Sequence, residues 1–206
     1  MTPRAVIFDI GNVLIEWQPE RYFDGLCGAA RRRAMFAAVD IAAMMNRIDA
    51  GAHFGEEAER MAEAHPDFAN ELLHFRDHWC QMAQPAIDHS VRMLRTMKAH
   101  DMPVFALSNF GAHNFPLSAA QFPFLHEFDR AYISGRMGLI KPDPAIYAAV
   151  ETDCGLPPEA LFFIDDRVDN IAAAAARGWQ VHHFLGPVGL AQNLITLGLL
   201  TPDQAQ

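Results

Sequence analysis

Cysteine is scarce in this sequence. The chain has 3 cysteines, Cys27, Cys80 and Cys154, which lie far apart and form no CxxC pair. An odd, scattered set of this kind excludes a disulfide framework and a thiolate metal site as the basis of the fold. We therefore expect a protein of a reducing compartment, the cytoplasm.

Positive charge is also in short supply. The chain has 16 Lys and Arg residues against 25 Asp and Glu residues, which gives a formal net charge of -9 at pH 7. A surface with this excess of negative charge repels polyanions on average, so we expect no nucleic-acid partner. The one basic cluster, Arg31–Arg33, lacks interleaved aromatic residues and is typical of a solvated helix face.

Long hydrophobic runs are missing. No segment reaches the roughly 18 apolar residues that a membrane span requires, and the start, MTPRAVIF, lacks the apolar stretch of a leader peptide. We expect a soluble protein with no membrane partner. What is present is an ordinary globular composition, with 206 residues of which 51% are hydrophobic and 20% charged. This length suits one well-buried domain with room for a smaller inserted one.

Short apolar runs rich in Val, Ile, Phe and Leu alternate with segments of helical length. This alternation is typical of βαβ units and predicts an α/β fold with a parallel sheet. Asp143 and Pro144 predict a helix start just after Lys141, and Gly178 predicts the end of the helix in NIAAAAARG. The candidate strands are Ala5–Ile10, Val104–Ser108, Ala131–Ser134, Leu161–Ile164 and Val181–Leu185.

The pattern changes between Pro19 and Pro85. No convincing strand is visible there, and Ala, Met, Arg and Glu recur at helical spacing. We predict a helical insertion at residues 17–85, and a core domain formed by residues 1–16 and 86–206.

Carboxylates stand where two of the candidate strands end. Asp9 follows AVIF, and Asp165 and Asp166 follow LFFI. Because the carboxyl ends of parallel strands surround one crevice, these side chains are expected to converge there. Like charges brought together require a cation or a proton, and an all-oxygen cluster suits Mg²⁺. The sequence therefore predicts a magnesium site at this edge of the sheet.

Neutral and positive groups are expected at the same edge. Ser108 and Asn109 end the strand VFALS and offer phosphate-oxygen donors, and Lys141 adds a mobile positive charge. Together these groups indicate phosphoryl transfer: Asp9 attacks phosphorus, Mg²⁺ and Lys141 neutralise charge, and Ser108 with Asn109 orient the substrate oxygens.

Four segments in this order resemble the motifs of the haloacid dehalogenase superfamily: FDIGNV, ALSNF, GLIKPDPAIY and FFIDDRVDNI. The resemblance spans nearly the whole chain. It implies a Rossmann-like core with a helical C1 cap inserted after the first strand, a phospho-aspartyl intermediate on Asp9, and Mg²⁺ as cofactor. The first and fourth segments are most similar to the subgroup with glucose-1-phosphatase-like enzymes and the phosphatase domain of soluble epoxide hydrolase.

One departure from the family pattern concerns the general acid. Most phosphatases of the family carry a second Asp two residues after the nucleophile, where this chain has Gly11. The resemblance implies that Gly11 still offers its backbone carbonyl to the metal, beside Asp9 and Asp166. General acid catalysis is worth about 10²–10⁴-fold. Its absence therefore favours substrates with a good leaving group, such as an anomeric sugar phosphate or an acyl phosphate. Water or a cap residue such as His53 is the alternative proton donor.

A second departure is Asn170, where many relatives place another Asp. Its amide oxygen is a candidate for holding the water shell of the metal. Asp166 is then the direct ligand, and Asp165 and Asp169 are supporting or helix-capping candidates.

Two alternatives to a phosphatase of a small phosphorylated metabolite stay open. A 2-haloacid dehalogenase uses the same nucleophile without metal or general acid, which fits Gly11, although adjacent carboxylates such as Asp165 and Asp166 are costly without a cation. A module that binds or senses a phosphorylated metabolite with little turnover is the second alternative. The sequence determines neither the substrate nor the oligomeric state.

The helical insertion is expected to close over the crevice and to set specificity. The candidates for contact with the organic part of the substrate are Trp17, Arg21, Arg47, Phe54 and Trp79.

Overall fold

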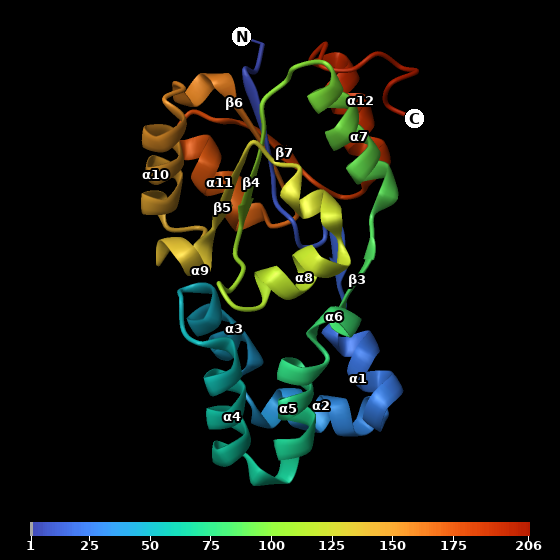
Figure 1. The fold of residues 1–206 in the computed structure, drawn as a ribbon, viewed down its shortest axis with the longest axis vertical. Coiled ribbons are helices and arrows are strands. Elements are labelled where there is room, and N and C mark those ends of the chain that lie inside the picture. The colour runs from blue at the N-terminus through green and yellow to red at the C-terminus, as the bar shows by residue number, and fades with distance from the viewer. Residues whose placement is uncertain (1) are drawn as a thin grey trace.

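The centre of the molecule is a five-stranded parallel sheet. The computed structural model describes residues 2–206 and places the strands in the order β5-β4-β1-β6-β7 (Figure 1). All four strand pairs are parallel, so the predicted α/β class is confirmed. The strands are β1 (Ala5–Phe8), β4 (Val104–Ser108), β5 (Arg130–Ile133), β6 (Leu161–Asp165) and β7 (Gln180–His183).

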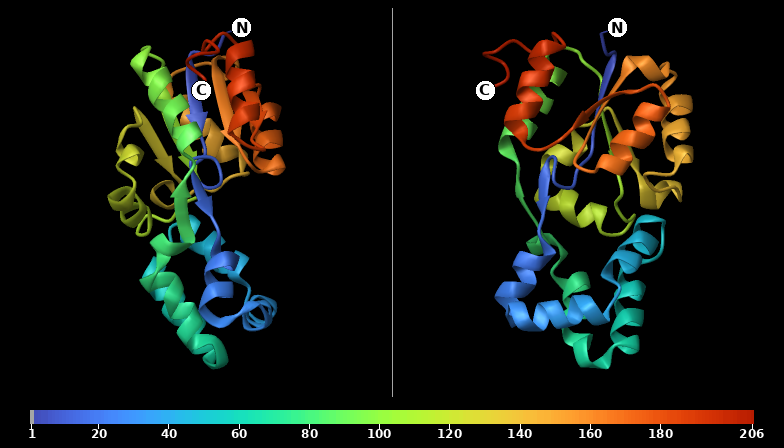
Figure 2. Two further views of the ribbon diagram at one scale, coloured as in Figure 1. Left: turned by 90° about the vertical axis from the view of Figure 1, so that its right-hand side faces the viewer. Right: turned by 180° about the vertical axis from the view of Figure 1, so that it is seen from behind.

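Helices cover both faces of the sheet, which gives a three-layer core (Figure 2). Along β1, Val6 and Phe8 pack toward α7 and α12, whereas Ala5 and Ile7 pack toward α10 and α11. A strand covered on both faces must be apolar throughout, which explains the continuous run AVIF. The covering helices are α7 (Asp88–Ala99), α10 (Pro144–Cys154), α11 (Val168–Ala176) and α12 (Pro187–Thr196).

The predicted start of α10 and the predicted end of α11 are confirmed. Asp143 caps α10, because its carboxylate accepts a hydrogen bond of 2.8 Å from the backbone N–H of Ala145. Helix α11 ends at Ala176, and Gly178 follows with a positive φ of 92°. The remaining core elements are α8 (Phe115–Gln121), α9 (Ser134–Met137), η2 (Pro123–His126) and η3 (Pro158–Ala160).

A separate group of helices occupies the chain between the first and second strands of the sheet. In Figure 1 this helical insertion lies below the carboxyl edge of the sheet. Its elements are α1 (Pro19–Cys27), α2 (Ala29–Ala38), α3 (Ile41–Asp49), α4 (Phe54–Ala64), η1 (Pro66–Phe68), α5 (Ala69–Asp77) and α6 (Trp79–Met82). The division into a cap at 17–85 and a core at 1–16 and 86–206 stays a prediction.

Two short strands join the insertion to the core. β2 (Ile15–Trp17) and β3 (Ala83–Ala86) pair as an antiparallel ribbon, and the backbone N–H of Gln18 extends it by donating to Met82. The prediction that no strand occurs between Pro19 and Pro85 is wrong for β3. The run is only four residues long and contains a proline, so it carries none of the alternation by which strands are recognised.

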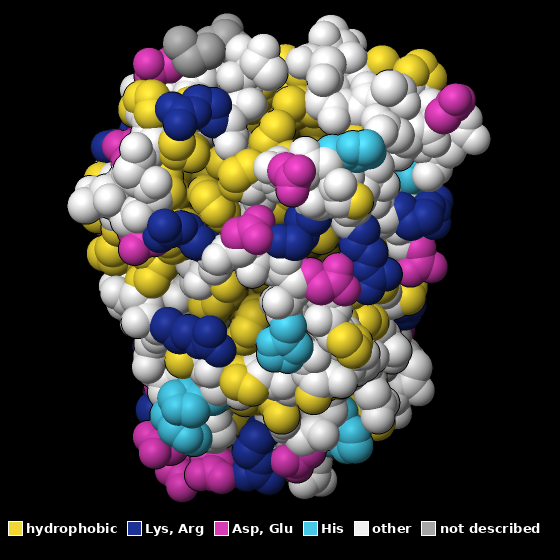
Figure 3. Space-filling model, turned by 45° about the horizontal axis from the view of Figure 1, so that its top comes forward, with side chains coloured by type: hydrophobic (Ala, Val, Ile, Leu, Met, Phe, Trp, Pro, Cys, Tyr) yellow, Lys and Arg dark blue, Asp and Glu magenta, His cyan; other side chains and the backbone are white. Residues whose placement is uncertain are grey.

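The outer surface carries both charges. On the face in Figure 3, Lys and Arg side chains lie among Asp and Glu side chains and form no continuous basic area there. Among residues 2–206, no helix combines the length and apolar character that crossing a membrane requires.

The loop after β4 packs closely on the start of α9. The backbone N–H of Gly135 donates to the carbonyl oxygen of Phe110 at 3.0 Å. A Cβ atom at position 135 would meet the backbone N of Ala112 at 2.5 Å and the Cα of Gly111 at 2.9 Å. Only glycine therefore allows this approach, which fixes the loop that begins with Asn109.

Gly135→Ala should lower the free energy of unfolding by about 1–3 kcal/mol, because the added methyl group meets backbone atoms that cannot move aside easily. Gly189→Ala is the matched control: nothing lies within 4 Å of its Cβ position, and it lies inside α12. We expect this control to gain about 0.5–1 kcal/mol. Urea unfolding of the three proteins measures both changes. Equal effects of the two substitutions would contradict the packing argument.

Candidate active site

Asp9 follows the carboxyl end of β1 and is held in a fixed orientation. Its Oδ1 atom accepts hydrogen bonds from the Ser108 hydroxyl at 2.6 Å and from the backbone N–H of Ile10 at 2.7 Å. Only 7% of Asp9 is exposed. One carboxylate oxygen is therefore engaged by neutral donors, and the other faces Lys141.

Lys141 reaches this carboxylate from the loop before α10. Its Nζ atom lies 3.1 Å from Oδ2 of Asp9 and 2.6 Å from Oδ2 of Asp165, and it donates to the backbone carbonyl of Leu107 at 2.8 Å. Asn109 anchors the lysine backbone: its amide donates to the Lys141 carbonyl at 2.9 Å and accepts from the Lys141 N–H at 2.8 Å. The Asn109 side chain therefore positions Lys141, and its predicted role as a phosphate donor stays a prediction.

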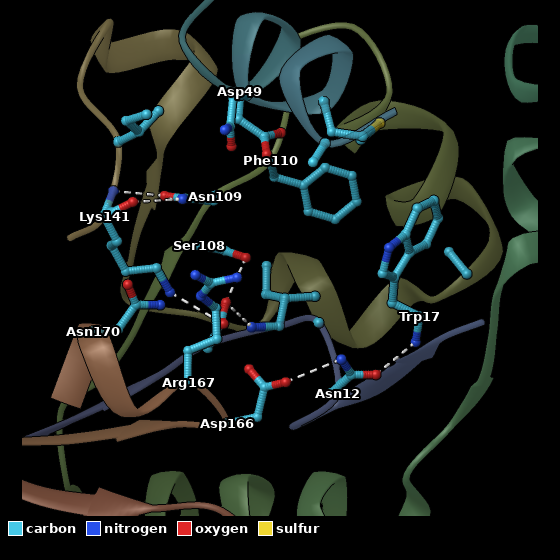
Figure 4. A pocket seen from close by; sticks show the side chains of 18 of the residues that line it. Asn12, Trp17, Asp49, Ser108, Asn109, Phe110, Lys141, Asp166, Arg167 and Asn170 are labelled. Atoms are coloured by element: carbon cyan, nitrogen blue, oxygen red, sulfur yellow. Dashed lines mark hydrogen bonds and ion pairs between the residues drawn. The ribbon is translucent and has the colours of Figure 1, made fainter. Parts of the chain in front are cut away.

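The carboxylates predicted to converge do so. Oxygen atoms of Asp9, Asp165 and Asp166 all lie within 4.8 Å of one another. Figure 4 shows Asp166 at one side of the pocket, where its Oδ2 accepts a hydrogen bond of 3.0 Å from the Asn12 amide. Asn12 in turn accepts from the backbone N–H of Trp17 at 3.0 Å.

Asp165 plays a supporting part in this cluster. It is fully buried, and it accepts hydrogen bonds from Lys141, from the backbone N–H of Arg167 at 2.8 Å and from the Asn170 amide at 3.0 Å. With its oxygens so engaged, Asp165 orients Lys141. Asp166, expected as the direct metal ligand, accepts a side-chain hydrogen bond from Asn12 and is partly exposed.

The ionisable groups influence each other strongly. Burial raises the pKa of Asp9 to about 7, and the positive charge of Lys141 opposes this rise. Burial also raises the pKa of Asp166, whereas the hydrogen bond from Asn12 lowers it. Burial alone would lower the pKa of Lys141, but the charges of Asp9 and Asp165 raise it above its ordinary value. The carboxylates outnumber the ammonium group, so the cluster favours a further positive charge.

The donor set fits a divalent cation of the oxygen-binding kind. Asn170 is buried, and its Oδ1 atom has no hydrogen-bond partner among the described residues. Asp9, Gly11, Asp166 and Asn170 all line the same cavity. Mg²⁺ prefers such carboxylate and carbonyl oxygens and keeps part of its water shell, which an amide oxygen such as that of Asn170 can hold.

Other candidates lie away from this centre. Asp169 is exposed and forms an ion pair of 2.6 Å with Arg167. His53 caps α4 and lies against His113, with ring centroids 4.1 Å apart, and the cavity lining does not include it. The structure thus does not bring His53 to the site as a proton donor.

A cavity of about 700 Å³ lies between the carboxyl edge of the sheet and the insertion. Of the predicted contacts, Trp17 and Trp79 line it, whereas Phe54, Arg21 and Arg47 do not. Phe54 packs against Trp79, and the two arginines pair with Glu16 and Glu57 respectively. Apolar residues that also line the cavity are Phe36, Ile41, Met45, Phe110 and Ile140.

Asn12 and Asp49 are among the lining residues that the sequence did not mark as candidates. Asn12 has a positive φ of 55°, a conformation that asparagine tolerates, and the GN pair after Asp9 was the available signal. Asp49, at the end of α3, is 9% exposed. No sequence pattern marks it, because its burial results from contact between the insertion and the core.

Similarity to a characterised protein is weak and partial. Drimenol cyclase drtB of Aspergillus calidoustus is 24% identical over 184 residues, which cover 86% of this chain and 33% of that protein. The chain therefore spans about a third of the length of this curated relative.

Solved structures share the fold. The HAD family enzyme bt-2542 from Bacteroides thetaiotaomicron is 20% identical, with a TM-score of 0.71 and coverage of 88% of this chain and 93% of that chain. The same enzyme is known in complex with magnesium and inorganic phosphate. L-2-haloacid dehalogenase from Xanthobacter autotrophicus with chloropropionic acid covalently bound is 18% identical, with a TM-score of 0.67 and coverage of 98% and 86%.

The family model described as haloacid dehalogenase-like hydrolase matches residues 3–178, a range that includes Asp9, Ser108, Lys141 and Asp166. With the fold, the order of these residues and their convergence on one cavity, this match shows that the chain belongs to the haloacid dehalogenase-like hydrolases.

Proposed function

We propose that this hydrolase is a magnesium-dependent phosphatase that acts on a small phosphorylated metabolite through a phospho-aspartyl intermediate. One observation carries the proposal. Oδ1 of Asp9 accepts from the Ser108 hydroxyl, Oδ2 of Asp9 faces Lys141, and a carboxylate oxygen of Asp166 lies within 4.8 Å of the same group. A carboxylate nucleophile, a fixed ammonium group and a second carboxylate suited to a cation are the parts that phosphoryl transfer requires.

The reaction would use these side chains in turn. An Asp9 oxygen attacks phosphorus while the bond from phosphorus to the leaving oxygen breaks. Lys141, held by Asp165, reduces the repulsion between the Asp9 carboxylate and the phosphate dianion. Water then attacks the phosphorus of the aspartyl phosphate, which releases inorganic phosphate and restores Asp9.

Three groups would hold the cation: the carboxylates of Asp9 and Asp166 and the backbone carbonyl of Gly11. Bound there, Mg²⁺ would supply positive charge to the phosphate oxygens and would offset the repulsion among the acidic groups. The bt-2542 complex with magnesium and inorganic phosphate supports this assignment by analogy of fold.

The cavity lining bears on the substrate class. Its insertion side carries Trp17, Phe36, Ile41 and Met45. Aromatic and aliphatic walls bind an organic group with an apolar surface better than they bind many hydroxyl groups. The lining therefore favours the phosphate ester of a partly apolar alcohol over the sugar phosphate suggested by Gly11 alone.

Halide release from a 2-haloacid is the second candidate reaction, and Gly11 is compatible with it. Within residues 2–206, the cationic side chains lining the cavity are those of Lys141 and Arg167. Both are paired with carboxylates, Lys141 with Asp165 and Arg167 with Asp169. A haloacid carboxylate would meet no unpaired cation there, which favours the phosphatase.

Asp9→Asn should reduce hydrolysis of p-nitrophenyl phosphate with Mg²⁺ by at least about 10³-fold, because the amide is a poor nucleophile. Circular dichroism should show an unchanged fold. The assay includes L-2-chloropropionate without metal. Halide release there, or comparable phosphatase rates for wild type and variant, would contradict the proposal. Wild-type protein that binds phosphate without turnover would indicate a binding module instead.

Asp166→Asn should raise the Mg²⁺ concentration needed for half-maximal activity by about 10–100-fold, because one anionic ligand becomes neutral. Asp169→Asn is the matched control, since it makes the same change three residues away on an exposed side chain. We expect it to shift the Mg²⁺ dependence by less than about threefold. Titration of activity from chelator-treated protein measures both shifts, and equal shifts would contradict the assignment of Asp166.

A further inference from the structure

One buried carboxyl group in the cavity has no part in the mechanism so far. Asp49 is the last residue of α3 and lines the same cavity as Asp9, although it comes from the insertion. Within residues 2–206 its side chain forms no hydrogen bond and no ion pair, and only 9% of the residue is exposed. A carboxyl group that is buried but unpartnered is costly for stability, so its presence invites a functional explanation.

The position of Asp49 is fixed by contacts on both sides of it in the chain. The Cγ2 atom of Ile48 lies only 2.5 Å from the place where a Cβ atom of Gly111 would stand. A Cβ atom of Gly51 would lie 3.3 Å from the carbonyl oxygen of Gly135. The end of α3 thus packs directly on core loops, and Asp49 lies between these two contacts.

Asp49 and the acidic cluster lie at opposite sides of the cavity. In Figure 4, Asp49 projects from the insertion, Asp166 lies on the far side, and Ser108 lies between them. A phosphate ester attacked by Asp9 has its leaving group on the side of phosphorus away from the nucleophile, as an in-line displacement requires. The leaving oxygen would therefore point toward the insertion, where Asp49 is.

Asp49 can carry a proton near neutral pH. Burial raises its pKa to about 7, and the nearby charge of Lys141 opposes part of this rise. The charged groups that share the cavity are Asp9, Glu16, Lys141, Asp166 and Arg167. A carboxyl group with a pKa near the working pH is well suited to give and take a proton.

The other donors in the cavity are less suitable. Gly11 has no side chain to give a proton, and the Ser108 hydroxyl already donates to Asp9. Glu16 is partly exposed, and its carboxylate is engaged in an ion pair of 3.0 Å with Arg21. Asp49 therefore meets the requirements of burial, position and protonation together.

We propose that Asp49 is the general acid and base that replaces the side chain missing at Gly11. As the bond between Asp9 and phosphorus forms, the bond from phosphorus to the leaving oxygen breaks, and that oxygen takes the proton of Asp49. The Asp49 carboxylate then accepts a proton from the water that attacks the aspartyl phosphate, which returns both residues to their starting forms. This assignment rests on the proposed phosphatase function.

Asp49→Asn tests the assignment through the leaving group. The substrates are p-nitrophenyl phosphate, phenyl phosphate and 2-phenylethyl phosphate, whose rings bind alike but whose leaving groups are progressively less acidic. The variant should lose about 10²–10⁴-fold in kcat/KM on 2-phenylethyl phosphate, an intermediate factor on phenyl phosphate, and less than about threefold on p-nitrophenyl phosphate. Asp67→Asn, an exposed aspartate of the insertion, is the matched control and should change none of the three.

A double variant keeps the test decisive. A Cβ atom at Gly11 would meet nothing within 4 Å, so a side chain can start there without a clash at Cβ. Gly11→Asp combined with Asp49→Asn should recover at least about tenfold of the lost activity on 2-phenylethyl phosphate. Equal losses on all three substrates, or no recovery, would overturn the role of Asp49 while leaving the phosphatase proposal intact. No turnover of any substrate by wild type would instead refute the proposed function.

Stability gives a readout that does not depend on activity. A carboxyl group whose pKa is higher in the folded than in the unfolded protein costs stability as the pH rises from its unfolded to its folded pKa. The melting temperature of wild type should therefore fall relative to that of Asp49→Asn between about pH 4 and pH 7. A constant difference across this range would overturn the assignment, because it would mean that folding does not raise the pKa of Asp49.

Discussion

The ammonium group of Lys141 is the interaction on which the carboxyl edge of the sheet depends. It lies between Asp9 and Asp165, is almost fully buried, and is fixed further by the carbonyl of Leu107 and by Asn109. Buried charges are tolerated only where partners compensate for the lost water. This single cation lets two buried carboxylates stand side by side, and it leaves the charge of Asp166 for another positive partner. The fit of the site to a divalent cation follows from this imbalance.

Much of the arrangement could be predicted from the sequence, because parallel topology carries it. Strands such as AVIF and LFFI can be recognised as continuous apolar runs because both faces of the sheet are covered. Because the strands are parallel, their carboxyl ends meet at one edge. Asp9, Ser108 and Asp166 follow from that rule, whereas Lys141 is expected from its place just before the helix that begins at Pro144. The hydrogen bonds between the Asn109 side chain and the Lys141 backbone could not be predicted in this way. Hydrogen bonding between loops depends on the path of the backbone, which no residue pattern shows.

The features that escaped prediction arise from packing between distant parts of the chain. In the sequence Asp49 cannot be told from an exposed aspartate at a helix end. Its burial becomes evident only once Ile48 packs against Gly111. The strands β2 and β3 are too short to leave a pattern. His53, one of the alternative proton donors, packs its ring on His113 and is not part of the cavity lining. Sequence reasoning therefore succeeds where one element determines the environment of a residue, and fails where two elements create that environment jointly.

The ribbon of β2 and β3 has a mechanical consequence for the acidic cluster. The backbone N–H of Trp17 in β2 donates to the side-chain oxygen of Asn12, and the Asn12 amide donates to Asp166. A rotation of the ribbon about Trp17 must carry Asn12 with it or break one of these bonds, and Asp166 then turns or loses a donor. A tilt of the helical insertion and the number of hydrogen bonds that Asp166 accepts are thereby coupled through the side chain of Asn12.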